Sequence, residues 1–164
     1  MSLTGSREYN IIITDTSCFI TLDKIGAFDI LHQAFKNIVT TPEIQQEFGS
    51  ELPQWIEIRP VRDTTLQEVF KETVDPGEAS AIALAMETSN AILIIDDLKG
   101  RKLASKMALN FMGTLGLLVK AKEYGVISSV KPYIEKIQAS NFRVSTSLVN
   151  LILERTGKNN RHKN

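Results

Sequence analysis

Short β-rich runs alternate with amphipathic stretches along almost the whole chain, and this alternation limits the possible folds more than any other feature. Strands are predicted at residues 9–14, 37–40, 55–61 and 90–95, and a further short strand is predicted at the start of residues 111–125. Helices are predicted between the strands, and three helical stretches follow the last strand. Short apolar strands that alternate with helices are typical of a parallel sheet covered on both faces. The pattern predicts an α/β protein, a three-layer α/β/α sandwich around a mostly parallel central sheet. Pro60 has no N–H to donate to a ladder, so the third strand is predicted at an edge of the sheet.

The chain is long enough for one domain with a substantial core. It has 164 residues, of which 43% are apolar and 23% are charged, which is ordinary for a globular protein. The domain is predicted at residues 10–156, after a disordered lead-in at 1–9 that includes a cloning remnant, and before a flexible basic tail at 157–164. The longest apolar runs are far shorter than the roughly 20 residues of a membrane span, and no secretory signal is visible. A single cysteine, Cys18, excludes an internal disulfide, so we expect a cytoplasmic protein with no membrane association.

The formal net charge of zero hides a strong segregation of charge along the sequence. Residues 1–97 contain six Lys and Arg against sixteen Asp and Glu, a net charge of −10, and residues 98–164 carry the compensating +10. An acidic metal site beside a wall that binds a polyanion would produce such a segregation. On charge alone, unrelated charges on separate helices explain it equally well.

Acidic residues follow two of the predicted strands at their carboxyl ends. Asp15 comes directly after the first strand, and Asp96 with Asp97 follows the fourth. In parallel sheets, functional side chains gather beyond this edge. Adjacent carboxylates repel each other, and the repulsion is stronger where water is scarce. The pair therefore needs a positive partner: a metal cation, an Arg or Lys side chain, or a helix N-terminus.

Most other catalytic chemistries lack the residues they need in this chain. The only histidines are His32, inside an amphipathic helix, and His162, in the basic tail, which argues against a Ser-His-Asp arrangement and a zinc site. Cys18 is better explained as a small buried apolar residue. The chain has no P-loop, and no aspartate after Asp97 that could accept a phosphoryl group as in a phosphorelay receiver. Carboxylates remain, and their hard oxygens suit Mg²⁺ or Mn²⁺.

Each candidate acid also has a structural explanation. Asp15 is well placed to cap the helix that follows it. Glu47 lies on a predicted helix where the spacing places it at the border of the core face, with Glu43 further toward water, and it could be an ordinary surface glutamate. Glu78 follows Asp75 by three residues, which is a capping-box spacing.

Five segments, in this order and at these spacings, together resemble the PIN-domain family. They are residues 11–26 (IIITDTSCFITLDKIG), 39–48 (VTTPEIQQEF), 75–85 (DPGEASAIALA), 92–104 (ILIIDDLKGRKLA) and 112–127 (MGTLGLLVKAKEYGVI). The segments are most similar to small prokaryotic PIN proteins related to VapC-type toxins. The resemblance covers roughly residues 10–155, and its specificity lies in the ordered set rather than in any one segment.

The resemblance implies an α/β/α fold and a divalent-metal-dependent endoribonuclease that uses Mg²⁺ or Mn²⁺ to hydrolyse RNA phosphodiesters. The toxin subgroup further implies a toxin–antitoxin pair, with an antitoxin protein as partner and a homodimer as the assembly. A stand-alone nuclease stays open. The alternative from another functional class is a PIN-like module that binds RNA or acts as a scaffold without turnover.

The resemblance also implies roles for individual residues. The catalytic acids are Asp15, Glu47, Glu78 and Asp97, and the metal ligands are Asp15, Glu78, Asp96 and Asp97. Asp97 matches the acid that the family carries after the fourth strand, with Asp96 beside it. The chain departs from many toxins in having Glu rather than Asp at position 78, and a doublet where one Asp often suffices. Ser17 matches the hydroxyl residue beside the first Asp and is expected near the substrate.

Three further residues are expected to contact the substrate on their own chemistry. Arg101 and Lys102 follow the doublet and would track the RNA backbone, although a solvated helix face explains them equally well. Thr114 would cap a helix whose free amides face a phosphate, or would serve as a purely structural cap.

Overall fold

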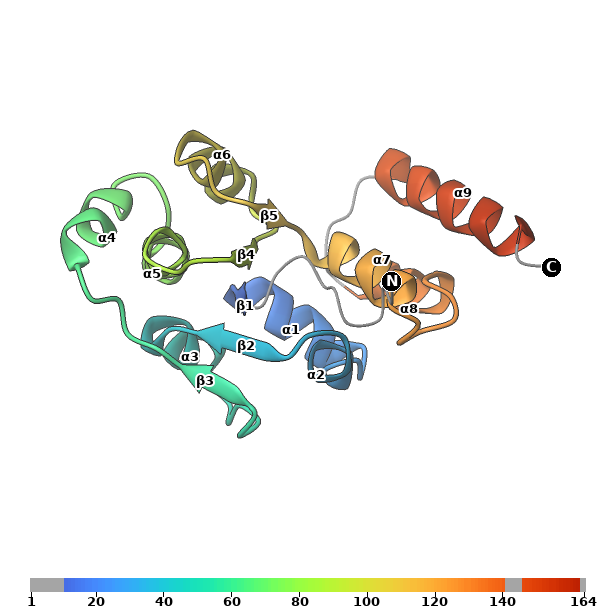
Figure 1. Ribbon diagram of the computed structural model, residues 1–164, viewed down its shortest axis with the longest axis horizontal. Coiled ribbons are helices and arrows are strands. Elements are labelled where there is room, and N and C mark those ends of the chain that lie inside the picture. Colours follow the sequence, from blue (N-terminus) through green and yellow to red (C-terminus); the bar gives the residue numbers. More distant parts are fainter. Residues whose placement is uncertain (1–10, 141–145, 163–164) are drawn as a thin grey trace.

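The computed structural model describes residues 11–140 and 146–162. Five strands form one parallel sheet in the order β3-β2-β1-β4-β5 (Figure 1). Their bounds are β1 (Ile11–Thr14), β2 (Asn37–Thr40), β3 (Ile56–Ile58), β4 (Ala91–Ile94) and β5 (Phe111–Met112). The prediction of a mostly parallel sheet is confirmed, because every pairing in the described sheet is parallel.

Helices connect the strands and cover the sheet. Their bounds are α1 (Thr16–Lys24), α2 (Asp29–Ala34), α3 (Pro42–Phe48), α4 (Thr64–Phe70), α5 (Pro76–Met86), α6 (Leu98–Lys106), α7 (Thr114–Glu123), α8 (Lys131–Ala139) and α9 (Thr146–His162). Helix α5 contacts β1 and β4 and is flanked by α3, α4 and α6, whereas α2 contacts β2 and packs against α7, which contacts β5. The α/β/α sandwich is thereby confirmed. Among the described residues, no helix is both long and apolar enough to cross a membrane.

Helix α5 shows why this sequence packs closely around its sheet. Its residues from Ala79 to Ala85 are all buried, and four of these seven are alanines. Small side chains let a helix approach a sheet and neighbouring helices at short range. Helix α5 thus brings its own N-terminus, with Glu78, to the edge of the sheet where β1 and β4 end.

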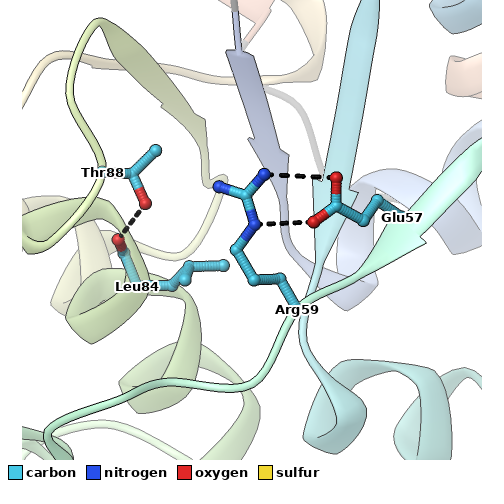
Figure 2. A network of polar contacts seen from close by, with 4 residues as sticks. All are labelled: Glu57, Arg59, Leu84 and Thr88. Atoms are coloured by element: carbon cyan, nitrogen blue, oxygen red, sulfur yellow. Dashed lines mark hydrogen bonds and ion pairs between the residues drawn. The ribbon is translucent and has the colours of Figure 1, made fainter.

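Strand β3 is an edge strand, as Pro60 predicts. Arg59, directly after β3, holds the carboxylate of Glu57 on the strand with two nitrogens, Nε to Oε2 at 2.7 Å and Nη2 to Oε1 at 3.2 Å (Figure 2). Both side chains are solvent-exposed, so this pair contributes little stability. Charged side chains on the edge nevertheless discourage another chain from adding a strand there.

At the other end of the chain, the structure and the sequence interpretation differ in one respect. Helix α9 runs through Gly157 and on to His162, so helix extends into the segment predicted as a flexible basic tail. Near this point, Lys122 Nζ of α7 donates to the backbone carbonyl of Thr156 at 3.3 Å, and both residues are buried. This contact ties the second half of α9 to the folded body.

Candidate functional site

The pairing of β1 with β4 brings the candidate acids to one edge of the sheet. Thr14 lies opposite Ile94 in the register, and the backbone N–H of Asp15 donates to the carbonyl of Ile94 at 3.1 Å. Asp15 and Asp96 therefore leave two adjacent parallel strands at the same carboxyl edge. Helices α1 and α6 begin directly after these two strand ends, whereas α5 follows α4 in the chain. Each helix is capped by an aspartate: α1 by Asp15, α5 by Asp75 and α6 by Asp97.

Asp15 is a helix cap and also belongs to the acidic cluster. Its Oδ1 accepts from the backbone N–H of Cys18 at 2.9 Å, and its Oδ2 accepts from the backbone N–H of Asp96 at 3.4 Å. The side chain is almost wholly buried, with 2% of its surface exposed. The capping alternative is thus correct for one oxygen, while the other faces the second strand end.

The two carboxylates of the doublet accept hydrogen bonds from the N-termini of two different helices. Asp96 faces α7, because Thr114 donates its backbone N–H to Oδ1 at 2.8 Å and its hydroxyl to Oδ2 at 2.6 Å. Asp97 caps α6 by accepting from the backbone N–H of Gly100 at 3.1 Å. Of the positive partners considered for the doublet, helix N-termini are therefore present in the structure itself.

Glu78 and Glu47 approach the same edge from α5 and α3. The backbone N–H of Glu78 donates to Asp75 Oδ1 at 2.9 Å, and Glu78 Oε2 is a buried oxygen with no hydrogen-bond partner among the described residues. Glu47 Oε2 accepts from the hydroxyl of Thr16 at 2.8 Å. Glu47 is thus held by the residue that follows Asp15.

The relative placement of Glu43 and Glu47 corrects a sequence expectation. Glu47, expected at the border of the core face, is exposed, whereas Glu43, expected further toward water, is half-buried and accepts from Gln67 Nε2 of α4. The angular spacing on α3 could not show that α4 covers that side of the helix.

Burial and the neighbouring acids raise the pKa values of two carboxyls. Burial, and then repulsion from Asp96, raise the pKa of Asp15 from 3.8 to about 8 against hydrogen bonds from two backbone N–H groups. Burial, a hydrogen bond to Asp75 and repulsion from Asp75, Asp97 and Asp15 raise the pKa of Glu78 from 4.5 to about 9. Both carboxyls therefore hold a proton near neutral pH unless a cation replaces it.

The residues present fit a divalent cation in ligand type and in charge. All the candidate donors are carboxylate oxygens, and the unpartnered Glu78 Oε2 is a buried acceptor that lacks a positive group. In the described part of the chain, no three His, Cys, Asp or Glu side chains are already close enough together to hold an ion. A bound cation would therefore have to draw the carboxylates together from these positions.

The residues expected near the substrate have different surroundings. Ser17 is half-buried in the first turn of α1, and Lys102 is exposed on α6. Arg101 is half-buried, with its guanidinium carbon 5.6 Å from the centre of the Phe111 ring. Thr114 is fully buried and gives both its donors to Asp96, which favours the structural explanation for Thr114.

Sequence reasoning missed two neighbours of the acids. Thr16 holds Glu47, and Asp75 acts on Glu78 both as a hydrogen-bond partner and as a like charge. The D-T-S and D-P-G-E runs contain both residues, but their spacing indicates only helix caps. Cys18 is fully buried, as expected, although it lies at this site, where burial and the charges of Asp96 and Asp15 raise the pKa of its thiol.

One comparison with known proteins found a match. A family model described as a PIN domain matches residues 11–158, which is most of the chain and includes every candidate acid. No curated protein matches the chain.

Proposed function

The chain belongs to the PIN-domain family, and from this premise we propose that it is an endoribonuclease that hydrolyses RNA phosphodiesters with Mg²⁺ or Mn²⁺. PIN domains are generally nucleases that use divalent metals. The observation that supports the proposal best is the gathering of Asp15 and Glu78 at one edge of the sheet, where burial and neighbouring acids raise their pKa values to about 8 and about 9. A positively charged ligand relieves such crowding.

Asp15, Glu78 and Asp97 are the proposed metal ligands, with Asp96 beside them. Thr114 donates to both oxygens of Asp96, whereas Asp97 gives one oxygen to the cap of α6. This difference favours Asp97 as the direct ligand of the doublet. A divalent cation bound here would supply an activated water and neutralise the charge that develops on the phosphate.

The remaining residues act on water and on substrate. Glu47, held by the Thr16 hydroxyl, is placed to orient a water molecule or to accept its proton. Ser17, in the first turn of α1, is two residues after the proposed ligand Asp15 in the chain. Arg101 and Lys102 of α6 follow Asp97 and are proposed to contact the RNA backbone.

The finer biological role follows the toxin subgroup. We propose that the chain acts in the cytoplasm as a homodimer and as the toxin of a toxin–antitoxin pair. A neighbouring reading frame that encodes a small DNA-binding protein, and co-purification of the two proteins, would support this role. Size-exclusion chromatography with light scattering checks the dimer separately.

One alternative is a PIN-like module that binds RNA without cleaving it. It is favoured by the lack of a preassembled cluster of three metal-binding side chains in the described residues. A cleavage experiment separates the two functions, because both bind RNA but only the nuclease turns it over.

The first prediction is metal-dependent cleavage of single-stranded RNA. Purified protein with Mn²⁺ or Mg²⁺ should cut RNA, and EDTA should stop the reaction. Asp15→Asn should lower the rate by about a hundredfold or more, because a metal ligand acts directly on the transition state. Asn caps a helix about as well as Asp, so the variant should fold.

Asp23→Asn is the matched control, since Asp23 is an exposed aspartate near the other end of α1. It should cleave like the wild type. If wild-type protein binds RNA but leaves it intact with either metal, the RNA-binding alternative is correct. If Asp15→Asn and Asp23→Asn cleave equally well, the site is elsewhere.

A further inference from the structure

Three glycines lie in close contact with acidic side chains of the candidate site. Of the eight glycines that the structure describes, three leave no room for a β-carbon, which would come closer than 3.0 Å to another group. They are Gly77, Gly100 and Gly113, and the crowding groups in each case include an acid of the site: Glu47, Glu78 and Asp96 respectively. At Gly100 the contact with Glu78 Oε2 would be 2.5 Å, and at Gly113 the contact with Asp96 Oδ1 would be 2.8 Å.

Backbone conformation does not explain these three glycines. The positive φ angles that favour glycine occur at Gly26, Gly49 and Gly125, and none of these three crowds an acid. Gly77 lies in the first turn of α5, where the backbone is helical. Glycine is less favourable than alanine in a helix, so what glycine provides at position 77 is space.

Gly77 is the position where that space serves a single side chain. A β-carbon there would lie 2.6 Å from Glu47 Cδ and closer still to both carboxylate oxygens, and these are its three nearest contacts. A β-carbon at Gly100 would also strike the fully buried Ile95, so packing alone accounts for Gly100. No comparable core contact is among the nearest neighbours of Gly77.

We propose that Gly77 is a positioning residue, whose missing side chain lets the Glu47 carboxylate lie against the first turn of α5 beside the proposed metal ligands. Thr16 also holds Glu47, by its hydrogen bond of 2.8 Å. The Glu47 side chain therefore contacts the chain neighbours of two proposed ligands. Thr16 is next to Asp15, and Gly77 is next to Glu78. The proposal rests on the proposed nuclease function for its catalytic meaning.

An alanine at position 77 should move the carboxylate without disturbing the fold. The crowded atoms belong to the far end of a flexible and exposed side chain, which can swing away at little cost. The helix itself gains from the substitution. Gly77→Ala should therefore melt at or above the wild-type temperature while Glu47 leaves its position.

The kinetic test compares Gly77→Ala with Glu47→Gln. Both should lower kcat by about tenfold or more, as small displacements of a catalytic group do, while KM for RNA and the Kd for Mn²⁺ stay within about twofold. In the double variant the two losses should not multiply, because both act through one carboxylate. Gly157→Ala is the control, since Gly157 lies in α9 with nothing within 4 Å of an added β-carbon, and its kcat should be unchanged.

A second readout does not depend on activity. With ¹³C-labelled glutamate, the carboxyl signal that disappears in Glu47→Gln should shift in Gly77→Ala and stay in place in Gly157→Ala. An unmoved signal, or losses in kcat that multiply in the double variant, would overturn the positioning role. If the wild type does not cleave RNA but the signal moves, the placement stands and the nuclease proposal fails.

Discussion

Asp15 uses each of its two carboxylate oxygens for a different purpose. One oxygen caps α1 through the N–H of Cys18, and the other accepts from the N–H of Asp96 across the sheet. The sequence interpretation treated helix capping and metal binding as alternatives. The structure shows that capping and membership of the acidic cluster coexist, because a strand end in a parallel sheet is also the start of the next helix.

Asp15 and Glu78 should make stability depend on pH when no metal is present. Their pKa values rise from 3.8 and 4.5 in the unfolded chain to about 8 and about 9 in the folded protein. Between these limits the folded state binds more protons than the unfolded state, so stability falls as pH rises. Glu78 contributes less than Asp15 to this pH dependence of stability, because its side chain is only half-buried and water screens its charge.

Thermal unfolding in EDTA, from about pH 5 to about pH 9, checks this dependence. The wild-type melting temperature should fall over this range, and Asp15→Asn should fall less steeply because Asn does not titrate. Asp23→Asn should follow the wild type. Equal slopes for all three proteins would show that Asp15 does not carry the effect.

At the residue scale, sequence predicted the acids better than it predicted their partners. The positions of Asp15, Glu78 and the doublet at element ends follow from strand and cap patterns within a few residues of each. The contact between Asp96 and Thr114 joins residues 18 positions apart, and local periodicity carries no information about it. The burial of Glu43 likewise depends on α4, which is distant in the sequence.

At the scale of elements, several helix N-termini bring positive partial charge to the edge of the sheet where the acids lie. Helices α1, α5 and α6 are capped by aspartates, and the first turn of α7 faces Asp96. Helix N-termini stabilise nearby negative charge. Pro42 and Pro76 both lie in the first turn of their helices, where proline is favoured. Which helix start meets which acid depends on the strand order.

Helix α6 is the element on which RNA contact should be tested. Lys99, Lys102 and Lys106 are exposed at spacings of three and four residues, so they share one face. Arg101 lies over Phe111 instead. If this face tracks RNA, Lys99→Glu with Lys102→Glu should reduce the slope of log affinity against log salt by about 1 for each phosphate that the protein no longer neutralises.

Lys36→Glu is the control for that charge reversal. Lys36 is exposed just before β2, at the amino end of the strands, whereas the acids lie at the carboxyl ends. It should leave the slope unchanged, and Mn²⁺ affinity should be the same in all variants. RNA binding that is independent of salt in the wild type would contradict an electrostatic role for α6.

At the scale of the whole molecule, the alternation of strands and helices was enough to predict the class of fold. All five strands and the edge position of β3 were predicted correctly. The strand order was not predicted, because the pairing of β1 with β4 joins segments separated by two other strands and is set by packing of the whole chain. That pairing creates the candidate site.

Metal binding should stabilise the whole fold if the acids form one site. A cation that binds only the folded state raises stability by about 2.7 kcal/mol at a concentration of 100 times its Kd. The wild-type melting temperature should therefore rise with Mn²⁺, and Asp15→Asn should show a smaller rise. If Mn²⁺ shifts neither protein in the absence of RNA, the acids do not form a metal site in the free protein.

The contact between Asp15 and Asp96 spans 81 positions of sequence, and this separation has a consequence for a protein made from its N-terminus. While the ribosome is still translating the first three strands, Asp15 and Glu47 have no β4 beside them and no doublet. The acid set can assemble only after β4 has left the exit tunnel and inserted next to β1. The candidate site therefore stays incomplete in a nascent chain until β4 has emerged and paired with β1.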